Sequence, residues 1–311
     1  MTVVRQLQSG LWPVWQGAAH QALRAMLGEL EGLAITGGES SVRLSPGLIE
    51  TGRWVAGFSP ANVATDRMMG LPGRLGMPAD GAAQFLAQWR SARQIYLSVE
   101  QSAEQVWAKV YWEYPLPAPD LVQRNPEQRQ VDLQIDSCKW DVGATLPRAR
   151  QTQYWRMGGL DGPGTVALLR QTQAMDPALQ SLYNAVADAL HLALQAEPLW
   201  RGYRLLLVRE TDHARHGVGL RFYGSDMCVI AAMKLLANLF KDWGIDPSQH
   251  PDLQSVWADQ ELGWLHAGLD NQSRPYLNVY GALSSADTRA VLMPVGQARD
   301  MSRAVMQESF L

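Results

Sequence analysis

Pairs of segments in which polar and apolar residues alternate recur along most of the chain. The clearest pair spans residues 95–115, where Ile95-Tyr-Leu-Ser-Val-Glu is followed, after a polar turn, by Trp107-Ala-Lys-Val-Tyr-Trp-Glu-Tyr-Pro115. Successive side chains of a strand point to opposite faces, so the second segment carries Lys109, Tyr111 and Glu113 on one face and Val110 and Trp112 on the other. We predict a β-hairpin whose apolar face is covered and whose polar face lines a space.

Four further segment pairs follow the same rule. We predict strands within 41–58, which bend at a Pro-Gly pair, in 131–136 and 150–156, in 203–210 and 218–223, and in 262–269 and 274–280. Apolar residues at helical spacing predict helices over 14–35, 80–93, 164–173, 176–195, 226–243 and 284–308, the first ending at Gly37-Gly38. Residues 61–79 are expected to form a loop with a short helical piece, and 116–129 a Pro-rich connection.

The order of these elements is an internal repeat of about five αββα units. The second strands place a cation and a tyrosine on one face: Lys109 with Tyr111, Arg150 with Tyr154, Arg221 with Tyr223, and Arg274 with Tyr276 and Tyr280. The opposite faces are apolar except in the third unit, which has Gln151, Gln153 and Trp155. Such hairpins can close into a ten-stranded antiparallel β-barrel surrounded by helices, wide enough to hold a ligand. We therefore predict an α+β fold and one barrel domain over 1–311.

Composition narrows the class of protein further. A chain that is 47% hydrophobic and 18% charged is globular, and its net charge of −3 provides no bulk attraction to nucleic acid or anionic membranes. The apolar run 227–240 is too short to cross a bilayer, and the N-terminus lacks the pattern of a signal peptide. The two cysteines, Cys138 and Cys228, have no metal-ligand spacing. We expect a cytoplasmic monomer or homodimer with no nucleic-acid partner and no membrane insertion.

Four cations directed into one lumen require an anion, because desolvation and mutual repulsion oppose their burial. A diphosphate would satisfy Lys109, Arg150, Arg221 and Arg274, since guanidinium groups bind phosphate oxygens in pairs. Aromatic rings beside a diphosphate suit an allylic carbocation, which ring faces stabilise. We predict that the diphosphate is held by these four cations and the carbocation is shielded by Tyr111, Tyr154, Tyr223, Tyr276 and Tyr280.

An aromatic acceptor would also need an anchor for its N–H group. Glu50, in the first strand pair, is the candidate, because a carboxylate can accept that hydrogen bond and take the proton. The chain has no Asp-Asp-x-x-Asp motif, so a metal-clustered diphosphate site is not indicated. We expect no required cofactor, with Mg²⁺ at most stimulating the reaction.

Over about residues 45–283, the chain resembles the aromatic prenyltransferases of the dimethylallyltryptophan-synthase type, which have an αββα barrel. Ile49-Glu50 followed by Phe58-Ser-Pro60 is similar to the segment holding the indole-binding glutamate, and Lys109-x-Tyr111 is similar to the family's Lys-x-Tyr diphosphate strand. Arg150-x-Thr152-x-Tyr154 and Pro275-Tyr-Leu-Asn-Val-Tyr280 resemble two later strands of the family. Two features depart from the family: Thr152 stands where it usually has Lys, and Arg53 lies near, but out of register with, a usual Arg.

The resemblance implies transfer of a dimethylallyl or longer prenyl group from its diphosphate to an indole such as tryptophan or a tryptophan-containing molecule or peptide. Two other functions stay open. One is a phenol- or tyrosine-directed prenyltransferase of the same fold, and the other is a non-catalytic barrel that binds an apolar or anionic small molecule. His266 faces the same side as Trp264 and is expected to be a core or rim residue.

Overall fold

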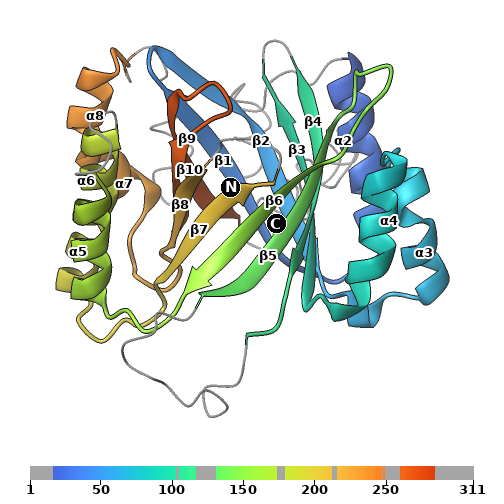
Figure 1. The fold of residues 1–311 in the computed structure, drawn as a ribbon, viewed down its shortest axis with the longest axis horizontal. Helices are drawn as coiled ribbons and strands as arrows, with labels where there is room; N and C mark the ends of the chain where they lie inside the picture. The colour runs from blue at the N-terminus through green and yellow to red at the C-terminus, as the bar shows by residue number, and fades with distance from the viewer. Residues whose placement is uncertain are drawn as a thin grey trace, which may run out of the picture.

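The computed structural model describes residues 17–102, 105–116, 131–173, 179–211, 216–246, 248 and 260–283. Ten antiparallel strands, each paired with its neighbours in the chain, form a barrel that β1 and β10 close (Figure 1). This confirms the predicted fold class. The strands are β1 Ile35–Ser45, β2 Leu48–Phe58, β3 Gln94–Gln101, β4 Val106–Glu113, β5 Val131–Asp141, β6 Arg150–Met157, β7 Arg204–Glu210, β8 His216–Arg221, β9 Leu262–Leu269 and β10 Pro275–Leu283.

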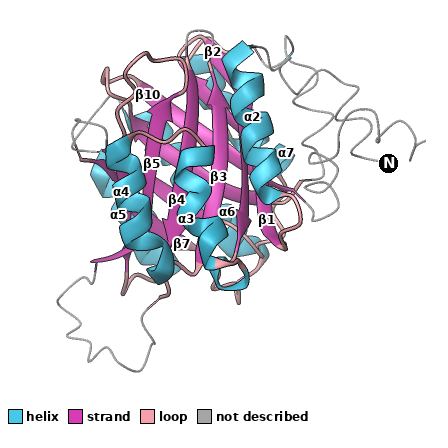
Figure 2. Cartoon of the chain, turned by 90° about the vertical axis from the view of Figure 1, so that its right-hand side faces the viewer, coloured by secondary structure: helices cyan, strands magenta, loops and turns pink. Residues whose placement is uncertain are grey.

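The described helices stand outside the barrel in two groups, one on each side in Figure 1. The first group is α2 Gly17–Leu30, α3 Thr65–Arg74 and α4 Ala79–Gln88. The second group is α5 Gly162–Gln173, α6 Gln180–Ala196, α7 Val229–Leu235 and α8 Ala237–Asp242. Figure 2 looks onto the first group, which lies in front of the strands. A described helix precedes every hairpin except β5–β6, whose preceding segment is outside the described residues.

Side-chain alternation turns the apolar face of most strands outward, toward the helices. Val110 and Trp112 of β4 are fully buried in a cluster with α2, α3 and α4, and the Trp112 ring lies 5.9 Å from that of Phe85. Leu220 of β8 and Leu277 of β10 are buried in a second cluster with α5 to α8. Most of the apolar core is therefore a layer between barrel and helices. The lumen holds polar and aromatic side chains, together with a small apolar cluster around Leu206 and Val208 of β7.

Strand β6 is the exception that its sequence predicts. Its outward residues Gln151, Gln153 and Trp155 are only half-buried and belong to neither cluster. In Figure 1, β5 and β6 cross the front of the barrel between the two helix groups. Gln151 instead donates to the buried Asp136 carboxylate at 2.7 Å, which also accepts bonds from Gln84 and Gln88 of α4. A polar outer face fits the part of the barrel between the helix groups.

Several predicted boundaries were wrong. Gly37 and Gly38 do not end a helix but lie inside β1. The short helical piece expected within 61–79, in contrast, is present as the helix α3. The predicted helix 226–243 is two short helices that meet at Leu236, and β5 runs five residues beyond the predicted end at Asp136, to Asp141. The bend between β1 and β2 is as predicted, and Gly47 there has a φ of 71°, which only glycine adopts readily. The predicted helix 284–308 and most of the connection 116–129 lie outside the described residues.

Among the described residues, no helix is long and apolar enough to span a membrane.

The apolar layer between strands and helices predicts which substitutions lower the free energy of unfolding. Leu97 of β3 is fully buried under the first helix group, whereas Leu146, between β5 and β6, is 87% exposed. We expect Leu97→Ala to lower the free energy of unfolding by about 2–5 kcal/mol, because it leaves a cavity, and Leu146→Ala to lower it by less than about 0.5 kcal/mol. Urea unfolding of both variants would measure this, and equal effects would contradict the outward orientation of Leu97.

Candidate active site

Two cavities occupy the lumen, one toward each end of the barrel. The cation cavity, about 730 Å³, is lined by Arg43, Glu50, Arg53, Lys109, Lys139, Arg150, Asp270 and Arg274 among others. The aromatic cavity, about 560 Å³, is lined by Glu39, Tyr96, Tyr111, Tyr154, Tyr223, Trp264, His266 and Tyr280 among others. Glu100 of β3 lines both cavities, so they are adjoining compartments of one lumen.

Three of the four predicted diphosphate ligands share the cation cavity. Lys109, Arg150 and Arg274 all line it. Arg221 does not: it lies in the aromatic cavity, where Nη1 donates to the Gly202 carbonyl at 2.8 Å and the guanidinium lies 4.8 Å from the Tyr223 ring centroid. The structure therefore does not bring Arg221 together with the other three predicted ligands.

A buried carboxylate holds the centre of the cation cavity together. Glu100 forms ion pairs with both Arg53 and Lys109. Burial by itself would raise the pKa of Glu100, but attraction to Arg53 and Lys109 outweighs it and holds that pKa well below its ordinary value. Glu100 therefore stays ionised and fixes both cations in the lumen. Sequence reasoning did not use this residue, although Tyr96, Ser98 and Glu100 alternate along one face of β3.

A lysine on the strand next to β6 lies close to Thr152. Lys139 of β5 is in register with both Lys109 and Arg150, and its ammonium group pairs with Glu210 at 2.6 Å. Thr152 itself is buried beside the same carboxylate, with Oγ1 at 3.5 Å from Oε1 of Glu210. Lys139 thus supplies a cation on the strand beside β6. It was missed because β5 was predicted to end at Asp136.

Glu50 lies in the cation cavity and not among the tyrosines that line the aromatic cavity. Its carboxylate is 3.6 Å from Nε of Arg43, which also pairs with Asp270 at 3.2 Å. The Arg43 guanidinium lies 4.6 Å from the Tyr276 ring centroid, which places Tyr276 at this end of the lumen. Asp270 also pairs with Arg274 at 3.0 Å. Glu50 is therefore positioned to orient Arg43.

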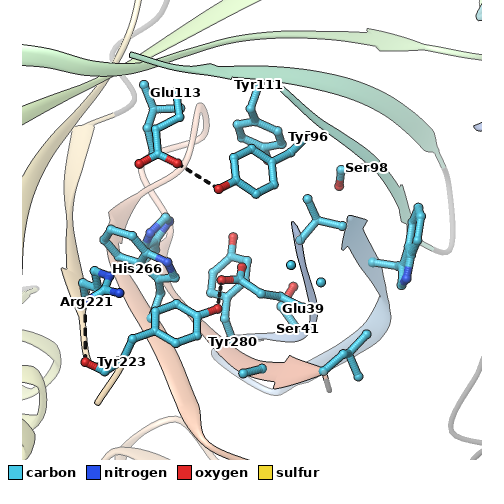
Figure 3. A pocket seen from close by; sticks show the side chains of 18 of the residues that line it. Glu39, Ser41, Tyr96, Ser98, Tyr111, Glu113, Arg221, Tyr223, His266 and Tyr280 are labelled. Atoms are coloured by element: carbon cyan, nitrogen blue, oxygen red, sulfur yellow. Dashed lines mark hydrogen bonds between the residues drawn. The ribbon is translucent and has the colours of Figure 1, made fainter. Parts of the chain in front are cut away.

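The aromatic cavity contains a connected set of rings. Tyr154 lies 6.2 Å from Tyr111 and 5.8 Å from His266, and His266 lies 5.5 Å from Trp264. His266 also lies 4.9 Å from Tyr280, and both rings are labelled in Figure 3. Four of the five predicted shielding tyrosines, Tyr111, Tyr154, Tyr223 and Tyr280, line this cavity. His266 lies at the centre of the set, opposite Gly219, where a Cβ atom would come within 2.9 Å of the imidazole. The lack of a side chain at Gly219 makes room for His266.

Glu39 of β1 is one of the carboxylates that line this cavity, with Glu100, Glu113 and Glu261. It accepts a short hydrogen bond from the hydroxyl of Tyr223 (Figure 3). Burial raises the pKa of Glu39 to about 7, and the Tyr223 hydrogen bond and the charge of Arg221 only partly oppose this. A carboxyl group of this kind exchanges a proton near neutral pH, as a general base must. Sequence reasoning missed Glu39 because Gly37-Gly38 was interpreted as a helix end.

Arg53 of β2 lines the cation cavity and reaches side chains of the aromatic cavity. Besides its ion pair with Glu100, Arg53 donates to Oγ of Ser41 at 3.2 Å and contacts the hydroxyl of Tyr280. Burial raises the pKa of Tyr280 to about 12, and burial raises that of Tyr111 well above its ordinary value. Neutral tyrosines therefore adjoin a buried cation at the junction of the two cavities.

The described residues contain no group of three or more His, Cys, Asp or Glu side chains placed to hold a metal ion. Metal independence of the chain stays a prediction.

No protein-family model and no curated protein matches the sequence. Among solved structures, NotF in complex with brevianamide F and DMSPP is 13% identical with a TM-score of 0.49, over 90% of this chain and 91% of that one. The 5-dimethylallyltryptophan synthase from Streptomyces coelicolor is 13% identical with a TM-score of 0.45, over 80% and 81%. AnaPT from Neosartorya fischeri is 14% identical with a TM-score of 0.44, over 79% and 78%.

The raised pKa of Glu39 predicts a specific pH dependence of stability. Between the ordinary value of 4.5 and about 7, the folded state binds more protons than the unfolded state, so the stability that Glu39 contributes at low pH is lost as the pH rises through about 7. We expect Glu39→Gln to reduce the loss of unfolding free energy between pH 5 and pH 8 by about 1–2 kcal/mol.

Urea unfolding at both pH values measures this difference. Glu31→Gln, at an exposed carboxylate just before β1, is the matched control and should behave like the wild-type protein. An unchanged pH dependence in Glu39→Gln would show that Glu39 titrates normally in the folded protein.

Proposed function

We propose that this protein is an aromatic prenyltransferase. The diphosphate of an allylic donor binds in the cation cavity, its prenyl group lies against the tyrosines at the junction, and the aromatic acceptor lies in the aromatic cavity. Ionisation of the donor produces a carbocation, which an electron-rich ring of the acceptor attacks, and the acceptor then loses a proton. The donor is a dimethylallyl or longer prenyl diphosphate, and the preferred acceptor is an indole.

The observation that carries this proposal is the direct adjacency of cations and tyrosines in one lumen. Among the described residues, six cations line the cation cavity and three carboxylates do, Glu50, Glu100 and Asp270, and one of the cations, Lys139, also pairs with Glu210. A diphosphate would balance that excess and accept charge-assisted hydrogen bonds as its negative charge develops. Arg53 contacts both Glu100 and Tyr280, so the leaving group and the shielding rings would be neighbours. Ring faces there can stabilise a carbocation and exclude water.

We assign the acceptor anchor to Glu39 and not to Glu50. Glu39 lies among the rings with a pKa near 7, so it can accept an indole N–H and then the proton released by the reaction. Glu50 instead neighbours Arg43 in the cation cavity. In this proposal Glu50 is a positioning residue for a diphosphate-binding arginine.

Incubation with dimethylallyl and geranyl diphosphate and a panel of indole, phenol and tyrosine acceptors tests the proposal, with and without EDTA. We expect prenylated indole and released diphosphate in both conditions. Product from phenols alone would indicate the phenol-directed alternative. Donor binding without diphosphate release would indicate a carrier, and no product with any acceptor would refute the proposed function.

Loss of a diphosphate ligand should weaken donor binding. We expect Lys109→Gln to raise the donor KM about 10- to 100-fold, because the lost contact joins an ammonium group to a phosphate. Lys241→Gln, at an exposed lysine of α8, is the matched control and should leave the donor KM unchanged. Donor KM values from steady-state kinetics measure the effect. An unchanged donor KM in Lys109→Gln would place the diphosphate elsewhere.

The two candidate carboxylates are separated by a pair of isosteric variants. We expect Glu39→Gln to lower kcat about 100-fold or more, since it removes the base, and to remove the rise of kcat with pH around 7. Glu50→Gln should act through Arg43, raising the donor KM and leaving the pH profile unchanged. The reverse result would restore the role predicted for Glu50 from the sequence.

A further inference from the structure

Arg150 differs from the other five cations of the cation cavity in what holds its side chain. The other five each pair with a carboxylate: Arg53 and Lys109 with Glu100, Lys139 with Glu210, and Arg43 and Arg274 with Asp270. Within the described part of the chain, the Arg150 side chain forms no ion pair and no hydrogen bond. Its guanidinium instead lies over the ring of Trp107, with Cζ at 4.9 Å from the ring centroid.

Strand pairing brings the Trp107 ring to this place. Trp107 precedes Lys109 by two residues on β4, so it points to the same face, and it lines the cation cavity. On the next two strands, Lys139 of β5 and Arg150 of β6 are directly opposite one another, where like charges repel. The Trp107 ring contacts both cations, since Nζ of Lys139 lies 5.5 Å from its centroid. One ring therefore attracts two cations that repel each other.

An aromatic ring holds a cation in a different way from a carboxylate. A carboxylate cancels the charge of a guanidinium and occupies its N–H donors, whereas a ring is neutral and attracts the cation through its electron-rich face. The N–H donors of a guanidinium lie in its plane, so contact with its face leaves them available. Arg43 also lies over a ring, that of Tyr276, but it pairs with carboxylates as well. Arg150 thus keeps both its charge and its donors for an anion.

We propose that Trp107 is a positioning residue, which holds the Arg150 guanidinium in place for the diphosphate of the donor. This rests on the proposed function and adds a residue to its donor site. A free arginine side chain occupies many rotamers, and ordering it when the ligand binds weakens the affinity. The ring orders Arg150 before the diphosphate arrives. Trp107 acts through Arg150 and makes no contact of its own with the reacting atoms.

The test measures the binding of inorganic diphosphate to the full chain by calorimetry. We expect Trp107→Leu to raise the Kd about 3- to 10-fold, because Arg150 must then be ordered on binding. Trp107→Phe keeps a ring and should raise it less than about twofold. Trp155→Leu, at a half-buried tryptophan on the outer face of β6, is the matched control and should bind as the wild-type protein does. Circular dichroism would confirm that the variants fold.

A double-mutant cycle shows whether Trp107 acts through Arg150. Arg150→Gln alone should raise the Kd for diphosphate about tenfold, because it removes a charge-assisted contact. In that background, Trp107→Leu should have no further effect, since no guanidinium remains to be positioned. In turnover, Trp107→Leu should raise the donor KM and leave kcat and the acceptor KM unchanged. A general disturbance of the barrel would lower affinity equally in both backgrounds.

Equal losses in the two backgrounds, or an unchanged Kd in Trp107→Leu, would overturn the inference. A wild-type chain that does not bind inorganic diphosphate would overturn it as well. The proposed function fails differently, through the absence of prenylated product from every acceptor. Because diphosphate binding is measured without turnover, the role of Trp107 is decided even in that case.

Discussion

A barrel with charged and aromatic side chains in its lumen must bury its apolar side chains outside. This constraint determines the rest of the fold, because each strand alternates and its apolar half needs a cover. Two helix groups supply that cover, and the strand between them, β6, has a polar outer face. The covered outer layer provides the hydrophobic stabilisation, which frees the lumen for residues that would be too costly in an ordinary core.

Charge pairing is what makes such a lumen tolerable. Glu100 and Glu210 each hold a buried lysine, and Glu100 also holds Arg53. Without these carboxylates the two lysines would lose protons or be displaced toward solvent, and Arg53, which does not deprotonate in proteins, would be an unpaired buried charge. The carboxylates do not neutralise all the cations of the cation cavity. A bound diphosphate would neutralise the remaining positive charge.

The alternation of polar and apolar residues along a strand shows which side chains point into the lumen. It does not show where along the barrel axis they lie. The inward orientation of Lys109 and Tyr111, and the barrel itself, could be inferred from five strand pairs. The height of a residue depends on the register between strands, which long-range pairing determines. Arg221 was therefore grouped with Lys109 although it lies in the other cavity. Glu39 was hidden for a local reason, since two glycines inside β1 have the pattern of a helix end.

Tyrosines that shield a carbocation must stay protonated, and this applies to those at the junction of the two cavities. A carbocation is captured by the best nucleophile within reach, and a phenolate is a far better nucleophile than a phenol. Burial raises the pKa of Tyr111 and Tyr280, so both stay protonated throughout the physiological range. Their ring faces can then stabilise a cation without their oxygens capturing it. Burial thus provides two things in the proposed reaction: it keeps water from the cation, and it keeps the shielding rings unreactive.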